Sequence, residues 1–263
     1  MTKLHQRFPW VVSIVCAALF LALALVGTPL GDQIEQSARL PVNSGILIQQ
    51  LLLALFSALA VTLLGGWRAA GFAKAVDWRA WLLYLPPLTG PVFVLFFTGI
   101  AATNASQLFM LVVFTGMIGF AEEALCRGVM VHAFLSQGVL KAALCSSLIF
   151  GSMHLINLFY GMNLGMALLY AVYAALIGFG FAAPYIRSGR AIWPAICAHA
   201  LFDFVGKLGH GWGAQAQPTS STEAVIRLSM ALLVGLYGFW LLRSSRRASQ
   251  TSRSYASEQA RAD

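Results

Sequence analysis

Six ionisable side chains stand within apolar stretches of this sequence, at positions that a lipid bilayer makes costly. They fall in three separate stretches and are, in chain order, Glu122, Glu123, Arg127, His154, His199 and Asp203. A charged side chain at mid-membrane costs about 2.5–3.5 kcal/mol on insertion scales. Such residues persist where they pair, line a water-filled cavity or perform chemistry, so the six predict one shared polar site.

The spacing of the first group suggests a division of tasks. Neighbours on a helix point about 100° apart, so Glu122 and Glu123 face different directions. Arg127 lies four residues beyond Glu123, on the same face and in the order that favours an ion pair. Burial makes such pairing necessary, so we interpret Glu123 and Arg127 as an orienting pair. Glu122 has no local cation, which suits a general base that takes a proton from water.

The other two groups show the same helical spacing. His199 and Asp203 are four residues apart, and Phe150 stands one turn before His154 on another segment. A single histidine inside a membrane more often serves helix–helix hydrogen bonding than catalysis. Several polar groups gathered into regularly spaced sets instead favour a functional site.

Composition decides what kind of fold must hold these residues. The chain has 263 residues, 59% hydrophobic and 10% charged, with a mean hydropathy of +0.76. Soluble domains carry roughly 25% charged residues, so we expect an all-α, polytopic membrane helix bundle. Membrane spans take about 20 residues each. We expect about eight transmembrane helices, with the active site inside the bundle, from the apolar segments 9–30, 45–65, 81–101, 107–135, 140–158, 163–185, 191–207 and 224–242.

The basic residues indicate how the bundle is oriented. With the N-terminus inside, thirteen of the seventeen Lys and Arg residues fall on the cytoplasmic side and three outside. This asymmetry predicts that both termini are cytoplasmic. The net charge of +8 then reflects topology and contact with anionic headgroups of the lipid bilayer, and we expect no nucleic-acid partner. A short chain with few loops favours the bacterial inner (plasma) membrane.

One membrane domain is expected over residues 1–242, with its motif-bearing core at about 80–210. Residues 243–263 are rich in Ser, Arg and Ala and are predicted to form a basic, disordered cytoplasmic tail. The four cysteines lie in apolar segments without CxxC spacing, which predicts free thiols.

The three motifs resemble those of the CPBP family, the CAAX-protease and bacteriocin-processing intramembrane proteases, also called the Abi family. The family pattern is EExxxR, then FxxxH, then HxxxN or HxxxD, on three helices. This sequence has EEALCR at 122–127, FGSMH at 150–154 and HALFD at 199–203. Their order and spacing agree with the pattern.

The resemblance implies a glutamate-dependent intramembrane endopeptidase. In such an enzyme Glu122 with His154 would activate the attacking water, and His199 with Asp203 would stabilise the oxyanion. Glu123, Arg127 and Phe150 would support the site. The implied substrate is the terminal part of a membrane-associated or exported protein.

Position 203 leaves the mechanism open. An oxyanion needs a hydrogen-bond donor, and an ionised Asp203 would repel it. Asp203 must therefore be protonated by burial, orient His199, or bind a metal. In the last case Glu122, His154, His199 and Asp203 would offer ligands suited to Zn²⁺. No HExxH motif occurs, so we favour a glutamic peptidase without a cofactor, with a zinc metallopeptidase as the alternative.

A function of a different class also stays open. Intramembrane Glu and His residues build proton relays, so the chain could be a non-catalytic transporter or a regulatory scaffold. Many transporters have repeated halves, and no such repeat is detectable here, which favours the protease.

Overall fold

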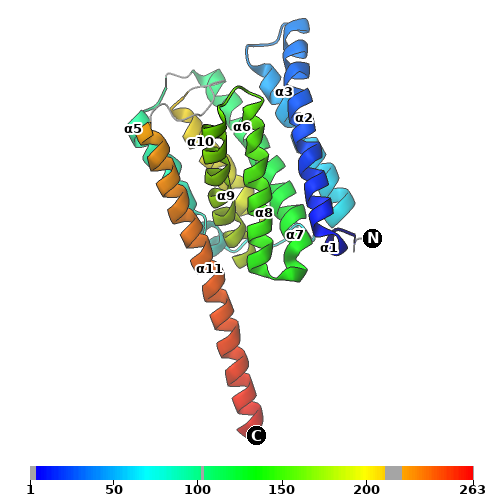
Figure 1. The fold of residues 1–263 in the computed structure, drawn as a ribbon, viewed down its shortest axis with the longest axis vertical. Helices are drawn as coiled ribbons and strands as arrows, with labels where there is room; N and C mark the ends of the chain where they lie inside the picture. Colours follow the sequence, from blue (N-terminus) through cyan, green and yellow to red (C-terminus); the bar gives the residue numbers. More distant parts are fainter. Residues whose placement is uncertain (1–3, 102–103, 211–220, 263) are drawn as a thin grey trace.

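The structure, a computed structural model, describes residues 4–101, 104–210 and 221–262, without the side chains of 65, 221–222 and 245–262. The labelled helices are α1 (Leu4–Arg7), α2 (Pro9–Ser37), α3 (Ser44–Ala60), α4 (Trp78–Leu82), α5 (Leu85–Thr98), α6 (Ala105–Glu123), α7 (His132–Phe134), α8 (Val139–Met153), α9 (Leu164–Arg187), α10 (Ile192–Leu208) and α11 (Ser221–Ala262). The described part of the chain contains no strand (Figure 1).

Four short segments of other helical types connect these helices. A π-helix over Val61–Gly65 continues α3, and a second over Ala124–Val131 joins α6 to α7. A 3₁₀ turn over Leu135–Gln137 follows α7, and another over His154–Leu158 follows α8. The first motif therefore lies where α6 passes into a π-helix, a feature frequent at functional sites, and the second lies where α8 passes into a 3₁₀ turn.

Each of the eight predicted apolar segments contains a helix, which confirms the polytopic helix bundle. Six stretches are long and apolar enough to cross a membrane, namely Pro9–Ser37, Ser44–Leu64, Ala105–Gln137, Val139–Leu158, Leu164–Arg187 and Glu223–Ser244. The third and seventh predicted segments form the shorter helices α5, of 14 residues, and α10, of 17 residues. At about 1.5 Å per residue α5 extends only about 21 Å, short of a hydrocarbon core of about 30 Å.

Local sequence explains where the helices around the site begin and end. Pro86 and Pro87 fall in the first turn of α5, and the helix ends at Gly99, whose φ of +72° favours glycine. Asn104 caps α6 by accepting from the Gln107 amide at 2.9 Å, and the Gln107 side chain accepts from the Asn104 amide at 3.1 Å. This reciprocal capping box fixes the start of the helix that carries the first motif.

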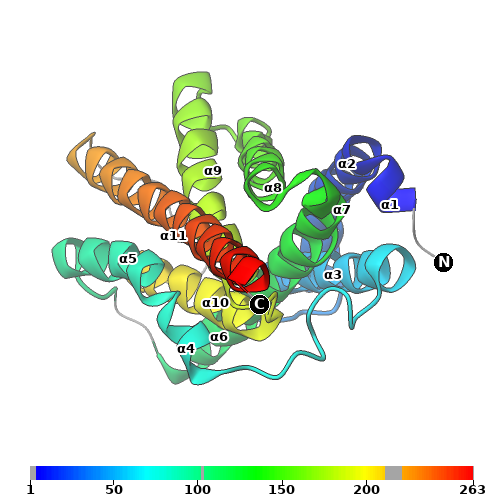
Figure 2. The same ribbon diagram turned by 90° about the horizontal axis from the view of Figure 1, so that it is seen from below.

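Eight of the described helices form a closed ring of contacts, and Figure 2 shows the bundle from one end. Neighbours in contact follow the order α2, α3, α6, α10, α5, α11, α9 and α8, and α8 returns to α2. The helices of the three motifs, α6, α8 and α10, are all members of this one ring. Chain order and ring order differ, because α10 inserts between α6 and α5.

Two close helix contacts depend on glycine. An added Cβ at Gly119 of α6 would lie 2.6 Å from the Ile196 carbonyl oxygen of α10. An added Cβ at Gly151 of α8 would lie 2.5 Å from the Ala171 carbonyl oxygen of α9. Without side chains at these positions the backbones approach closely, which is how helices pack in membranes.

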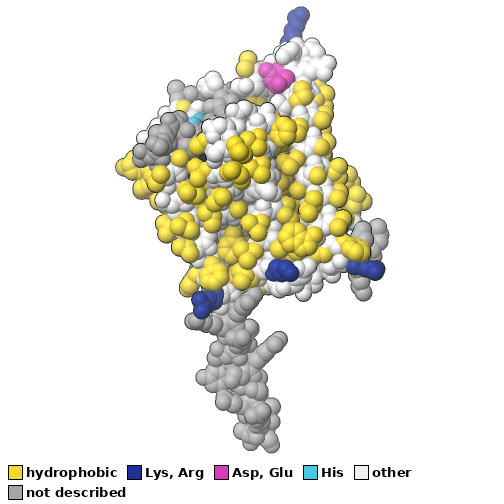
Figure 3. All heavy atoms as spheres, viewed as in Figure 1, with side chains coloured by type: hydrophobic (Ala, Val, Ile, Leu, Met, Phe, Trp, Pro, Cys, Tyr) yellow, Lys and Arg dark blue, Asp and Glu magenta, His cyan; other side chains and the backbone are white. Residues whose placement is uncertain are grey.

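The outer surface of the ring suits lipid. Large apolar side chains such as Val26, Leu55 and Phe96 are exposed, Phe96 to 83%. Figure 3 shows hydrophobic side chains covering the visible face, with Lys and Arg side chains at its lower border. Together with the span lengths this identifies an integral membrane protein.

The C-terminal helix is longer than the predicted apolar segment. α11 continues to Ala262, through residues for which the sequence predicts a disordered tail. Helices gain most of their stability from packing of an apolar face, and the residues beyond 242 are polar. The domain boundary at 242 and the disorder of the tail remain predictions.

Candidate active site

Glu123 joins the first and third motifs. It is the last residue of α6 and its side chain is fully buried. One carboxylate oxygen, Oε1, lies 2.7 Å from Nδ1 of His199 on α10, and the other, Oε2, lies 3.0 Å from Nε of Arg127. The predicted Glu123–Arg127 pair is therefore present, and the contact with His199 was not foreseen from spacing.

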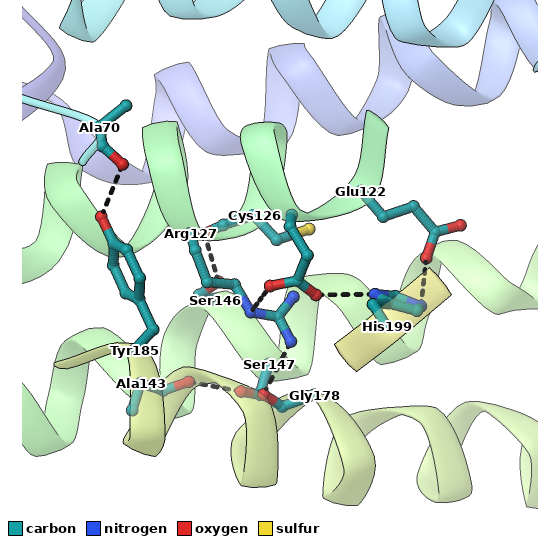
Figure 4. A network of polar contacts seen from close by, with 11 residues as sticks. Ala70, Glu122, Cys126, Arg127, Ala143, Ser146, Ser147, Gly178, Tyr185 and His199 are labelled. Atoms are coloured by element: carbon teal, nitrogen blue, oxygen red, sulfur yellow. Dashed lines mark hydrogen bonds and ion pairs between the residues drawn. The ribbon is translucent and has the colours of Figure 1, made fainter. Parts of the chain in front are cut away.

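Arg127 is held by groups from two further helices. Its Nη2 donates to the Gly178 carbonyl of α9 at 3.0 Å, and Figure 4 shows it reaching this carbonyl. Its guanidinium carbon lies 5.3 Å from the ring centre of Phe150 and 6.0 Å from that of Phe181. Ring faces attract cations, and the attraction is larger away from water. Phe150 thus contacts the buried cation directly.

Glu122 points toward a different set of groups. Its side chain keeps 21% of its surface accessible, and Oε2 lies 3.5 Å from Nε2 of His199 (Figure 4). The same ring nitrogen lies 3.9 Å from Oδ2 of Asp203. The sequence offered Glu122 no local cation. The structure instead places beside it a histidine from α10, 77 residues further along the chain.

His154 stands slightly apart from the other predicted residues. Its Nδ1 lies 3.0 Å from the Phe150 carbonyl, which can only accept, so Nδ1 carries the hydrogen and Nε2 is left as an acceptor. Its ring packs against those of Phe150 and Tyr170. Among the described residues no hydrogen bond or ion pair joins His154 to Glu122, His199 or Asp203.

His154 lines a cavity together with the carboxylates of Glu122 and Asp203. A cavity of about 420 Å³ runs from Glu122 and His154 along α2 and α3, and a second of about 210 Å³ contains His199 and Asp203. The two cavities share four lining residues, Glu122, His154, Tyr170 and Lys207. All four predicted catalytic side chains therefore line one or both of two neighbouring cavities.

Sequence reasoning missed several residues of these walls. Lys207 lies four residues after Asp203, so it continues the stripe of His199 and Asp203, and this spacing was a usable signal. Tyr170 on α9 and Gln49 on α3 carried no comparable signal. Gln49 reaches the larger cavity because α3 packs against α6, and Tyr170 reaches both cavities from α9, which packs against α8 and the turn after it.

The donor set can be tested against a metal. Structural zinc sites bring four ligands to one ion, and catalytic sites bring three. Within the described ranges, no group of three or more His, Cys, Asp or Glu side chains is arranged to hold a metal ion. The four alternative ligands as they stand do not form such a site, and metal dependence is left to experiment.

The comparison with known families covers the part of the chain that contains these motifs. Residues 104–205 match the family model described as type II CAAX prenyl endopeptidase Rce1-like, and the match spans all three motifs. This match, which covers 102 of the 263 residues, is consistent with the CPBP family. The match supports a CAAX-type intramembrane endopeptidase in general, and a membrane protease of this kind implies a membrane-embedded peptide or protein as substrate. No curated protein and no solved structure matches the chain.

The extent of the match also separates the ring into two parts. The matched region begins at the cap of α6 and includes α8, α9 and most of α10. The helices α2, α3, α5 and α11 complete the ring from outside the match. Both cavities are walled by helices of the two parts.

Proposed function

We propose that this protein cleaves a peptide bond near the terminus of a membrane-associated or exported protein, with Glu122 as the base that activates water. One observation carries the proposal. Glu122 lines both cavities, whereas Glu123 is enclosed and bound through both oxygens. Of the two neighbouring carboxylates, Glu122 is placed to meet water and substrate.

The proton transfers follow from this placement. Glu122 accepts a proton from water, assisted by the acceptor nitrogen of His154, while the water oxygen attacks the scissile carbonyl carbon. The carbonyl oxygen becomes an oxyanion. Protonated Glu122 then gives the proton to the leaving nitrogen as the carbon–nitrogen bond breaks. The products are a new carboxyl terminus and a new amine.

His199 is the proposed donor to the oxyanion. Glu123 accepts at Nδ1, which fixes the ring and leaves Nε2 directed at the space between Glu122 and Asp203. A hydrogen on Nε2 would point to where negative charge develops, and one such donor typically contributes 10²–10³ in rate, about 2.7–4 kcal/mol. Arg127 would offset the charge of Glu123 beneath it.

Asp203 acts by orienting His199 in this proposal. Its Oδ2 lies 3.9 Å from Nε2, close enough to hold the ring through charge and too far for a strong hydrogen bond. Asp203 then need not donate to the oxyanion, which removes the difficulty of an ionised aspartate at this position.

The location of the enzyme is proposed from its charge pattern. The excess of Lys and Arg in alternate connections supports both termini in the cytoplasm, and the short chain with few loops favours a bacterial inner membrane. A cysteine-accessibility experiment on intact cells tests this orientation.

The test of the proposed function uses purified protein and candidate membrane substrates. Glu122→Gln should abolish cleavage while the unfolding temperature stays unchanged. Asp32→Asn, an exposed carboxylate outside both cavities, is the matched control and should keep full activity. Full activity of Glu122→Gln would refute the mechanism, and inhibition by a chelator that zinc reverses would replace it with the metallopeptidase.

A further inference from the structure

The larger cavity contains an arrangement of amide groups that the proposed chemistry does not use. Its far wall is formed by α2, α3 and the turn after α8, and carries Thr28, Gln49, Asn157 and Tyr160 among apolar side chains. Removing an amide group from water costs free energy unless the group finds hydrogen-bond partners. The nitrogen and the oxygen of each amide should therefore have hydrogen-bond partners.

The nitrogen of Gln49 is used inside the protein. Its Nε2 donates to the Ala24 carbonyl at 2.8 Å and to Thr28 Oγ1 at 2.8 Å, and Tyr160 lies beside both. The Ala24 carbonyl can only accept, which fixes which end of the amide is nitrogen. These bonds hold α3 to α2, as polar side chains commonly do between membrane helices.

The side-chain oxygen of Gln49 takes no part in these contacts between α3 and α2. Among the described residues Oε1 has no hydrogen-bond partner, and it is not enclosed by protein atoms. Asn157 repeats the arrangement, since its Nδ2 donates to the His154 carbonyl at 2.7 Å and its Oδ1 is likewise unpaired and accessible within the described structure. Both residues line the same cavity as Glu122. The cavity therefore offers two amide oxygens with their orientation fixed.

Two acceptors in an apolar cavity call for a ligand that is apolar and carries N–H donors. An extended peptide segment meets both requirements. A peptide bond must leave its helix to be attacked, and its freed main-chain groups then need partners, because the bilayer interior supplies none. A lipid acyl chain has no donor to offer.

We propose that Gln49 and Asn157 bind main-chain N–H groups of the substrate, so that the larger cavity holds an extended peptide segment on one side of the scissile bond. This inference rests on the proposed function for its substrate class. Gln49 lies on α3, outside the matched family region, so the N-terminal helices contribute substrate binding as well as scaffold.

The test measures binding without cleavage. The probes are fluorescent, apolar peptides of twelve residues, each N-methylated at one successive position, and binding to the full-length protein in micelles is followed by anisotropy. In the wild type, methylation at one or two positions should weaken binding about threefold to tenfold, the value of one hydrogen bond. In Gln49→Met the unmethylated peptide should bind about threefold to tenfold more weakly than it binds the wild type. Methylation at one of the positions that are sensitive in the wild type should then have no further effect.

Thr28→Val separates binding from packing. It removes a partner of the Gln49 nitrogen and leaves the oxygen, so it should lower the unfolding temperature and keep the methylation effect. Equal methylation effects in wild type and Gln49→Met, or no binding of any peptide, would overturn the inference. Because no bond is cut, failure of Glu122 as a base would leave these results unchanged.

Discussion

Glu123 Oε1 and His199 Nδ1 lie 2.7 Å apart, and this contact joins α6 to α10, two neighbours in the ring. The carboxylate is shared, because its second oxygen binds Arg127 at 3.0 Å. A single buried side chain thus fixes the ring of His199 and compensates a buried guanidinium. The neighbouring Glu122 is therefore not needed to hold His199 or to compensate Arg127, and its side chain lines the cavities.

Replacing Glu123 should therefore harm stability as well as activity. Glu123→Gln leaves the charge of Arg127 uncompensated, and removing one partner of a buried pair costs about 3–5 kcal/mol. Unfolding of the purified protein in mixed micelles measures this loss. The double variant Glu123→Gln, Arg127→Met should recover part of the stability and none of the activity. A loss below about 1 kcal/mol in the single variant would show that the pair is not buried as described.

The close approach of α6 and α10 depends on Gly119. In Gly119→Ala the new methyl group would meet the Ile196 carbonyl, so the helices must separate by some tenths of an ångström and Glu122 and Glu123 must move relative to His199. We expect cleavage to fall by at least about 100-fold, as a small misplacement of catalytic groups can cause.

Gly116 provides the matched control on the same helix. An added Cβ there meets nothing within 4 Å. Gly116→Ala should keep full cleavage activity and raise stability by about 0.4–1 kcal/mol through its effect on the unfolded chain. Equal activity of the two alanine variants would contradict the account of the α6–α10 contact.

His154 is expected to act on the rate more than on substrate affinity. Removing an acid–base group lowers the rate about 10²–10⁴-fold, so His154→Gln should lower kcat by this amount with little change in KM. Steady-state kinetics on a cleavable peptide measure both constants. A raised KM at unchanged kcat would assign His154 to binding instead.

Asp203 distinguishes the orienting role from the metal role. Asp203→Asn keeps an oxygen beside His199 Nε2, so cleavage should stay within about tenfold of the wild type, whereas Asp203→Ala should lose more. Loss of bound zinc together with activity in Asp203→Asn would instead favour metal coordination.

Local spacing predicted local contacts well. The interval of four residues correctly paired Glu123 with Arg127 and put His199 and Asp203 on one face, because both depend only on helical geometry. The apolar segments predicted the helices for the same reason. The shortness of α5 was less evident, although its prolines and Gly99 show where it begins and ends.

Contacts between distant segments could not be derived in this way. The insertion of α10 between α6 and α5 sets Glu122 beside His199, and no interval in the sequence encodes that neighbour. The wall that contains Gln49 depends on the packing of α2 and α3 against the site. The π-helix after Glu123 also escaped prediction, since the spacing of its residues does not distinguish a π-helix from an α-helix.

The central claim is that water activated by Glu122 attacks the peptide bond directly. A single turnover with excess enzyme in H₂¹⁸O, followed by mass spectrometry of the product, tests it most directly. We predict one ¹⁸O atom in the new carboxyl terminus in the first turnover, and no product from Glu122→Gln. A first-turnover product with an unlabelled carboxyl group would show that an enzyme side chain attacks first, and would contradict the claim.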